Sequence, residues 1–454
     1  MTMQINTREA TDIKLVKSIA LRMSDPKKVK DIVIDPLNRP SKLMKKGDLW
    51  GDLSIAGGFP GILALYIELD RQFPDEGWDE ITHEYIIATV HALESAETLY
   101  PSMYGGLAGI CFFFRQASKG ETRYQKVLAK IENALFDLIQ TSYLNPMKES
   151  FEQGLFQDSR LSEAILGLSG VGIYLLSCCH IEKVKQLTRE VIASLIRLSE
   201  PIEVFGKKVP GWYVSPEFFF LDEHKEKNPK GCFNLGLSHG ITGVLAFLSI
   251  AKLKGIEVVG LTEAIRTISD WICSKRRTTE QRYYWDTQIS FDDEITGNDT
   301  VQHKSRDAWC YGTPGVTRSL YLAGEALYDA DLKQFAYESF LSVFQSSQKQ
   351  WQLAGPTVCH GIAGLFMITQ VMARDSQCDI LKNKVQMLRN ILLSYYDSNL
   401  PFGFQHEELL TDPEGATAWV NKADLLEGAS GVLLSLLSLY SKSSNWHHLF
   451  LIDY

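Results

Sequence analysis

Two cysteines and one histidine lie at the start of two similar glycine-rich turns. Cys310 lies just before the turn at residues 312–315, and Cys359 and His360 precede the turn at residues 361–364. Thiolate and imidazole are typical zinc ligands, and a set of three leaves the fourth tetrahedral position for water or substrate. Because two thiolates cancel the charge of the ion, a substrate thiol bound there would lose its proton and stay electron-rich. The set predicts alkylation of a thiol rather than activation of water. The alternative is that the cysteines are small packing residues.

Four other residues near the turns could take part in the chemistry. His239 lies inside a similar turn, where it either supports a helix start or acts as an acid or base near neutral pH. Arg306 either pairs with Asp307 or a neighbouring acid, or holds a carbonyl or a developing enolate. Glu163 could orient His239 or begin a helix. Tyr311 could pack or form hydrogen bonds.

Seven glycine-rich turns recur along the chain, and an apolar stretch follows each one. Such stretches lack a polar face and are typical of helices buried on all sides. Amphipathic segments, such as residues 126–139, lie between them. Repeated units that recur about every fifty to seventy residues bury a continuous core by stacking on their neighbours. The turns are residues 57–61, 105–109, 167–170, 236–243, 312–315, 361–364 and 428–431.

The repeat predicts an all-α fold, an α/α-barrel (toroid) of seven inner and seven outer helices with short β-rich insertions. An open superhelix is the other arrangement. Closure into a single domain over residues 1–454 is favoured because neither end carries an evident polar capping repeat. In a barrel the inner helix N-termini could meet at one mouth, where their dipoles favour anions such as a thiolate or an enolate. The candidate ligands would lie there together.

Two longer connections interrupt the repeat. Residues 201–232 combine a hairpin-like pattern with an aromatic run that includes Phe220, and residues 276–307 combine aromatic and acidic residues with a turn. Both lead into turns that carry His239 or Cys310, so we expect them to border the same mouth. They are either ordinary loops or a wall that grips an extended peptide through aromatic and backbone contacts.

The composition limits the class of protein without identifying it. A formal net charge of −9 argues against a nucleic-acid-binding protein, which ordinarily carries a basic surface. No apolar run reaches the roughly eighteen residues of a membrane span, and the first residues lack the apolar core of a signal peptide. We therefore expect a cytoplasmic protein whose eight cysteines are thiols or metal ligands rather than disulfides.

Four of the turns resemble those of the lanthionine synthetase C-like proteins, the lanthipeptide cyclases, in the class I stand-alone form. The matching motifs are GLSHGITG (residues 236–243), RDAWCYGTPG (306–315), CHGIAG (359–364) and LEGASG (426–431). They are specific in combination, and the match involves turns across nearly the whole chain. The resemblance implies an α/α-barrel that holds Zn²⁺ through Cys310, Cys359 and His360.

The resemblance also implies an activity. Members of this family add peptide cysteine thiols to dehydroalanine or dehydrobutyrine, which closes thioether rings in a precursor that a separate enzyme has dehydrated. The acid/base histidine of the family corresponds to His239, and its arginine and tyrosine correspond to Arg306 and Tyr311. Glu163 stands where the family usually has aspartate, so its orienting role depends on where the longer side chain reaches. Thr313 replaces a common glycine, and we expect this to affect only local turn geometry.

The expected partners follow from the same resemblance. They are a dehydrated precursor peptide with its leader, and a dehydratase and an exporter in a membrane-associated complex. We expect no nucleic acid among the partners. Such a complex would attach the protein peripherally to the inner face of the cell membrane. Two alternatives remain: a thiol transferase that adds glutathione or another small thiol to dehydro residues, and a non-catalytic scaffold of a peptide-modification complex. The scaffold would not need the zinc ligands.

Overall fold

Helices form most of the protein in a computed structural model, and the chain divides into two compact units. Unit 1 consists of Met1–Tyr100, Tyr104–Glu132 and Leu353–Trp446, and unit 2 consists of Pro101–Met103, Asn133–Gln352 and His447–Tyr454. A single domain over residues 1–454 stays a prediction. Phe220 and parts of the 276–307 insertion lie outside the described residues. The structure describes residues 2–43, 49–154, 158–219, 222–279, 282–298, 305–411, 415–441 and 445–454.

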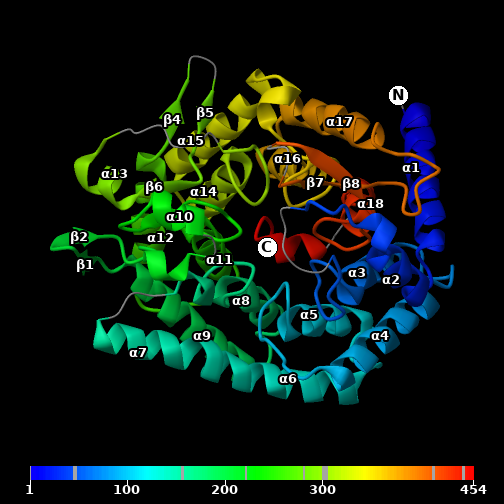
Figure 1. Cartoon of the computed structure of the whole chain (residues 1–454), viewed down its shortest axis with the longest axis horizontal. Helices are drawn as coiled ribbons and strands as arrows, with labels where there is room; N and C mark the ends of the chain where they lie inside the picture. Colours follow the sequence, from blue (N-terminus) through cyan, green and yellow to red (C-terminus); the bar gives the residue numbers. More distant parts are fainter. Residues whose placement is uncertain are drawn as a thin grey trace. The chain divides into compact units, whose positions relative to one another are not determined.

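Apolar helices that start directly after glycine-rich turns form the core of unit 1. They are α3 (Phe59–Gln72), α5 (Leu107–Ala117), α16 (Ile362–Ser376) and α18 (Ala429–Leu437). Most of their residues are buried, as expected for stretches without a polar face. Helix α18 contacts α16 and α3, and α3 contacts α5, so these helices pack in the order α16, α18, α3, α5 (Figure 1).

Amphipathic helices cover this core. Helix α4 (Trp78–Ser95) packs on α3, and α17 (Asp379–Leu393) packs on α16. The partner of α18 is the N-terminal helix α1 (Thr2–Arg22), and Asp12 of α1 forms a buried ion pair with Arg389 of α17. The other elements of unit 1 are α2 (Pro26–Ile34), η1 (Pro36–Asn38) and the antiparallel pair β7 (His406–Leu409) and β8 (Thr417–Val420). Helix α6 (Gln125–Ile139) begins in unit 1 and ends in unit 2.

Unit 2 repeats the same design with three apolar helices. Helix α11 (Ile241–Leu253) contacts both α8 (Leu168–Ser177) and α14 (Thr313–Leu327). An amphipathic helix follows and packs on each: α9 (Glu182–Ile196) on α8, α12 (Leu261–Ser274) on α11, and α15 (Ala330–Leu341) on α14 (Figure 1). In α12 the buried residues Leu261, Ile265, Ile268 and Ile272 recur at helical spacing, which places them on one face.

The insertions of unit 2 contain short strands. β1 (Ile202–Val204) and β2 (Lys207–Val209) form an antiparallel hairpin, β3 (Cys232–Asn234) pairs with β6 (Gln288–Ser290), and β4 (Arg277–Thr278) pairs with β5 (Tyr283–Tyr284). The remaining elements are a π-helical turn (Gln140–Leu144), α7 (Asn145–Gln153), η3 (Ser159–Leu161), η4 (Arg197–Ser199), η5 (Pro216–Phe218), α10 (Asp222–Lys227), α13 (Phe291–Thr296), η6 (Ser342–Gln345), η7 (Gln348–Trp351) and η8 (Trp446–Phe450), whose first residue belongs to unit 1.

A close backbone approach explains why a glycine recurs at the same place in the turns. A Cβ atom added to Gly170 would lie 2.0 Å from the carbonyl oxygen of Ala164, six positions earlier, which is closer than any side chain allows. The same conflict with a carbonyl six positions earlier occurs at other turns, at 2.0 to 2.4 Å. The pairs are Gly61 with Ile55, Gly243 with Leu237, Gly315 with Trp309, and Gly431 with Leu425.

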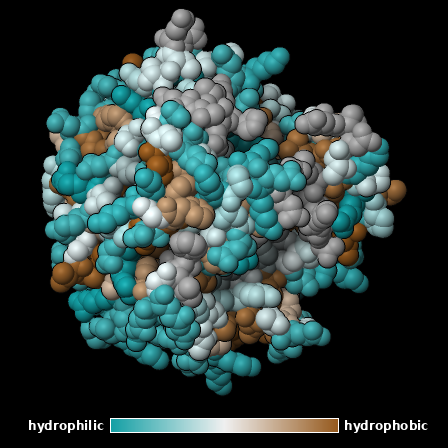
Figure 2. Space-filling view, turned by 60° about the vertical axis from the view of Figure 1, so that its left-hand side comes forward, coloured by the Kyte–Doolittle hydropathy of each residue, from teal (hydrophilic) through white to brown (hydrophobic). Residues whose placement is uncertain are grey.

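The surface agrees with a chain that buries its apolar helices. The face drawn in Figure 2 is mostly hydrophilic, and its hydrophobic atoms form separate patches. Among the described residues, no helix has both the length and the apolar character that crossing a membrane requires. The mostly helical character and the short strand pieces predicted from the repeat are confirmed.

Candidate active site

Three turns of unit 2 meet around the backbone of Cys310. The N–H groups of Leu237 and Ser238 donate hydrogen bonds to the Cys310 carbonyl oxygen at 2.9 and 3.2 Å. The carbonyl oxygen of Ser238 in turn accepts a hydrogen bond from the N–H of Ala164 at 3.1 Å. The turns before α8, α11 and α14 are therefore tied together by backbone hydrogen bonds, which fixes the positions of their functional side chains.

The carboxylate of Glu163 reaches His239 despite its extra methylene. His239 Nδ1 lies 3.0 Å from Glu163 Oε2, and this carboxylate also accepts hydrogen bonds from the N–H groups of Ile165 and Leu166. Glu163 is buried in a turn and does not begin a helix, while the His239 side chain is 40% exposed. Because the imidazole is held on one side and open on the other, it can exchange a proton with a bound molecule.

The surroundings of His239 favour its protonated form. Burial has the largest single influence on the pKa of His239 and lowers it, because a buried charge loses hydration. The hydrogen bond and negative charge of Glu163, with a smaller contribution from Cys310, outweigh burial and raise this pKa above its ordinary value. Burial and the charge of Glu163 thus act on the pKa of His239 in opposite directions, and the carboxylate makes the net change a rise.

We expect Glu163→Gln to lower the pKa of His239. Glutamine keeps the size of the side chain but removes the charge and the carboxylate hydrogen bond, while the burial that lowers the pKa remains. The midpoint of any activity limb that depends on His239 should move to lower pH, whether the acid or the base form is active. NMR titration and the pH dependence of kcat/KM measure this shift. Glu149→Gln, an exposed change on α7, should leave the midpoint in place, and an unchanged or higher midpoint for Glu163→Gln would contradict the assignment.

Tyr311 is held by a residue that the sequence analysis missed. The side-chain amide of Asn234, at the end of β3, donates a hydrogen bond to Tyr311 Oη at 3.1 Å. Burial raises the pKa of Tyr311 well above its ordinary value, so the phenol keeps its proton. Asparagine two positions before a turn glycine is typical of an Asx turn, which is the signal that could have identified it.

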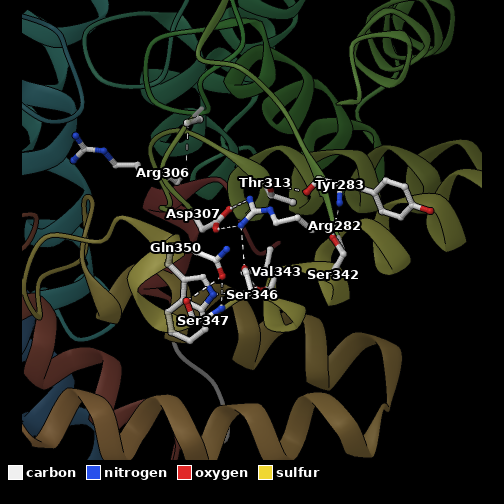
Figure 3. Close-up of polar contacts among 12 residues, drawn as sticks. Arg282, Tyr283, Arg306, Asp307, Thr313, Ser342, Val343, Ser346, Ser347 and Gln350 are labelled. Atoms are coloured by element: carbon white, nitrogen blue, oxygen red, sulfur yellow. Dashed lines mark hydrogen bonds and ion pairs between the residues drawn. The ribbon is translucent and has the colours of Figure 1, made fainter. Parts of the chain in front are cut away.

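Arg306 is not the partner of Asp307, so that structural interpretation of Arg306 is wrong. Asp307 instead forms a buried two-pronged ion pair with Arg282, at 2.5 and 2.7 Å (Figure 3). The half-buried Arg306 side chain extends away from this pair, and among the described residues its guanidinium makes no hydrogen bond or ion pair. The role of Arg306 in holding a carbonyl or an enolate stays a prediction.

The Arg282–Asp307 pair anchors the segment that leads to Cys310. The N–H of Asp307 also donates a hydrogen bond to the carbonyl oxygen of Trp351 at 2.8 Å, and Arg282 donates one to Ser346. A Cβ atom on Gly312 would lie 1.8 Å from the Arg306 carbonyl oxygen, and its φ of 101° is one that other residues rarely adopt. The turn thus depends on both the ion pair and this glycine.

Replacing Asp307 by asparagine should destabilise the protein. Removing one partner of a buried ion pair leaves the other charge uncompensated, which costs about 3–5 kcal/mol of the free energy of unfolding. Urea denaturation followed by circular dichroism measures this loss. The control is Asp292→Asn, because Asp292 pairs with Lys230 where both side chains are more than half exposed, and such pairs contribute about 0–1 kcal/mol. Equal small losses for the two variants would contradict the anchoring role.

The turn of Cys359 and His360 in unit 1 is held in a comparable way. The N–H of Cys359 donates a hydrogen bond to the carbonyl oxygen of Leu426 at 2.9 Å, which ties the turn before α16 to the turn before α18. The N–H of Ala354 donates one to the His360 carbonyl oxygen at 2.9 Å. Both candidate ligands therefore sit on a fixed backbone directly before a buried helix.

His360 also has a second group of possible metal ligands beside it. One ligand atom each of His360, His406 and Glu427 lie within 4.8 Å of one another. However, the ammonium of Lys422 lies 2.6 Å from Glu427 and 2.7 Å from Glu408, and its side chain is almost fully buried. Because Lys422 already neutralises Glu427, we interpret this group as an ion-pair network that supports the His360 turn rather than as a metal site.

The predicted site residues are thus divided between the two units. In unit 2 the structure brings His239 to Glu163 and ties the His239 turn to Cys310, with Tyr311 held by Asn234. Cys359 and His360 lie in unit 1. Sequence reasoning identified these residues but missed Asn234, Arg282 and Lys422.

The buried helices that start after glycine-rich turns agree with the family that comparisons with known proteins show. Residues 49–451 match the family described as lanthionine synthetase C-like protein, and the chain belongs to this family. It is of the class I lanthipeptide cyclase type, which confirms the resemblance seen in the motifs. This membership supports a cyclase that forms lanthionine rings.

Two relatives show how far the likeness extends. The chain is 25% identical over 402 residues to "Nisin biosynthesis protein NisC" of Lactococcus lactis subsp. lactis, covering 87% of each chain. It superimposes on a solved structure of "Nisin cyclase" with a TM-score of 0.72 and 23% identity, covering 94% of this chain and 97% of the other. The fold is therefore that of nisin cyclase, an α/α toroid, and the predicted fold class is confirmed.

Proposed function

We propose that the protein closes (methyl)lanthionine rings in a lantibiotic precursor by adding peptide cysteine thiols to dehydroalanine or dehydrobutyrine. The observation that carries the proposal is the His239–Glu163 pair, at 3.0 Å, in a turn tied to the backbone of Cys310. A proton-transfer group beside a candidate thiol-binding residue is what a thiol addition requires. The likeness to "Nisin biosynthesis protein NisC" supports a precursor peptide as the substrate. That this peptide is dehydrated and carries its leader is part of the proposal.

We propose Cys310, Cys359 and His360 as ligands of a catalytic zinc ion. Their donor chemistry, two sulfurs and one imidazole nitrogen, suits Zn²⁺ and leaves one position for substrate. The family membership supports a metal in this role. Zinc bound there would lower the pKa of a coordinated peptide thiol so that it is a thiolate near neutral pH.

The protein side chains handle the other charges of the reaction. As the new bond forms between sulfur and the β-carbon, the π electrons of the dehydro residue move to its carbonyl oxygen, giving an enolate. Arg306 and Tyr311 supply a cation and a hydrogen-bond donor that would stabilise this oxygen. His239, oriented by Glu163, either takes the thiol proton or delivers a proton to the α-carbon. In the product a new S–Cβ bond and a new Cα–H bond replace the S–H bond and the Cα–Cβ π bond, so product and substrate have the same atoms.

Leu198, Trp212, Tyr213 and Val214 line a small pocket beside His239. All four side chains are buried, so this pocket is too narrow to seat a peptide and does not separate a peptide substrate from a small thiol. A dehydratase and an exporter remain proposed partners, with a cytoplasmic protein attached peripherally to the inner membrane face. We base these partners and this location on the family membership alone.

Mass spectrometry of a dehydrated, cysteine-containing peptide tests this function. After incubation with the protein, thiol alkylation should fall while the peptide mass stays unchanged, because a ring forms without gain or loss of atoms. A mass increase equal to added glutathione would instead indicate a thiol transferase. Full alkylation with unchanged mass would favour the scaffold and overturn the proposal.

A further inference from the structure

Asn234 makes two side-chain hydrogen bonds whose directions are fixed. Its Oδ1 accepts a hydrogen bond from the N–H of Gly236 at 2.8 Å, and its Nδ2 lies 3.1 Å from Tyr311 Oη. A backbone N–H can only donate, so the amide oxygen must face Gly236 and the amide NH₂ must face Tyr311. The amide therefore donates to the phenol oxygen and cannot accept its proton.

This contact determines how Tyr311 can use its hydroxyl group. Because one lone pair of the oxygen accepts from Asn234, the O–H proton must point elsewhere. Among the residues that the structure describes, Asn234 is the hydrogen-bond partner of this hydroxyl, so the proton remains available for another molecule. The ring packs directly against Gly236, where an added Cβ atom would lie 2.4 Å from Tyr311 Cε1, so only glycine leaves room for the ring in this position.

Asn234 also lies in the right place to serve the reaction. It lines the same small pocket as Glu163 and His239. The chain of hydrogen bonds from Gly236 to Asn234 to Tyr311 thus passes beside the proton-transfer pair at Asn234. Each bond in such a chain polarises the next, which strengthens the final donor.

We propose that Asn234 is a positioning residue that makes Tyr311 a hydrogen-bond donor toward the substrate carbonyl oxygen. This inference rests on the proposed ring-forming function. When the thiolate adds to the β-carbon, the electron pair of the Cα–Cβ π bond moves to that oxygen, and Tyr311 stabilises it by hydrogen bonding without giving up its proton. Asn234 acts only through Tyr311 and does not touch the reacting atoms.

The Asn234→Asp variant tests the proposal because it reverses one hydrogen bond and keeps the other. One carboxylate oxygen still accepts from Gly236, while the other now accepts the Tyr311 proton and turns it away from the substrate. We expect kcat for ring formation to fall roughly 10²-fold, with little change in KM, as when one oxyanion donor is removed. Tyr311→Phe should lose a similar factor.

A variant that combines Asn234→Asp with Tyr311→Phe shows whether Asn234 acts through Tyr311 or in another way. In the Tyr311→Phe background, Asn234→Asp should cause no further loss, because there is no hydroxyl left to direct. An electrostatic effect of the new carboxylate on His239 would persist in that background, and equal losses in both backgrounds would overturn the inference. Asn234→Ala, which removes the amide donor without adding a charge, should behave in the same non-additive way.

Controls separate this inference from the proposed function. Asn133→Asp, an equal charge change at an exposed position of α6, should leave kcat unchanged. Circular dichroism and zinc content should match the wild-type protein in every variant. Rings formed normally by the wild-type and by Asn234→Asp would overturn the positioning role alone. A wild-type protein that forms no rings would contradict the proposed function, and the inference with it.

Discussion

Cys310→Ala should lose bound zinc and ring formation together. Removing one of the three proposed ligands should weaken metal binding, and a catalytic metal typically contributes several kcal/mol to stabilising the transition state. We therefore expect ring formation to slow by on the order of 10³-fold or more, since each 1.36 kcal/mol is a factor of about ten. Elemental analysis gives the zinc content, and mass spectrometry of the alkylated peptide gives the rate.

Cys273→Ala is the matched control for this experiment. Burial, together with the charge of Asp270, raises the pKa of the Cys273 thiol to about 12, so it stays protonated and is a poor metal ligand. This variant should keep full zinc content and full activity. Full zinc content in Cys310→Ala would remove Cys310 from the ligand set.

His239→Ala should keep its zinc and lose ring formation. General acid–base catalysis contributes about 10²–10⁴-fold to a rate, and the Glu163 pair prepares His239 for this role. We expect a loss in that range. Apart from His239, the groups described above that contact the Glu163 carboxylate are the backbone N–H groups of Ile165 and Leu166, and a backbone N–H cannot act as an acid or base in place of the imidazole. Single-turnover ring formation, with zinc content measured on the same sample, separates proton transfer from metal loss.

His180→Ala serves as the control, since His180 is an exposed histidine of the same unit. It should show unchanged rates and zinc content. An unaltered rate and ring pattern in His239→Ala would make His239 a structural residue and leave proton transfer without a named group.

The sequence reveals the helices of the fold because their signals are local. Each apolar stretch after a glycine-rich turn became a buried helix, and the glycines recur because the backbone six positions earlier leaves no room for a Cβ atom, as at Gly170. By contrast, the pairing of α1 with α18 joins the two ends of the chain. No local pattern encodes such a long-range contact, so it was not predicted.

In the candidate site, too, local features can be predicted from the sequence while long-range contacts cannot. The residue types and turn positions of His239 and Cys310 are visible in the sequence, but the partners of charged residues are not. Asp307 pairs with Arg282, 25 positions earlier, rather than with its neighbour Arg306, and spacing along the chain does not encode such a contact. The reach of the Glu163 side chain depends on its torsion angles, which spacing along the chain does not determine.

X-ray absorption at the zinc K-edge, with and without a dehydrated cysteine-containing peptide, tests most directly whether the metal binds and activates the substrate thiol. We predict two sulfur ligands at about 2.3 Å and one imidazole nitrogen at about 2.0–2.1 Å in the protein alone. A third sulfur should appear at the same distance when the peptide binds. A protein without zinc, or a zinc ion whose sulfur ligands do not increase with peptide, would contradict it.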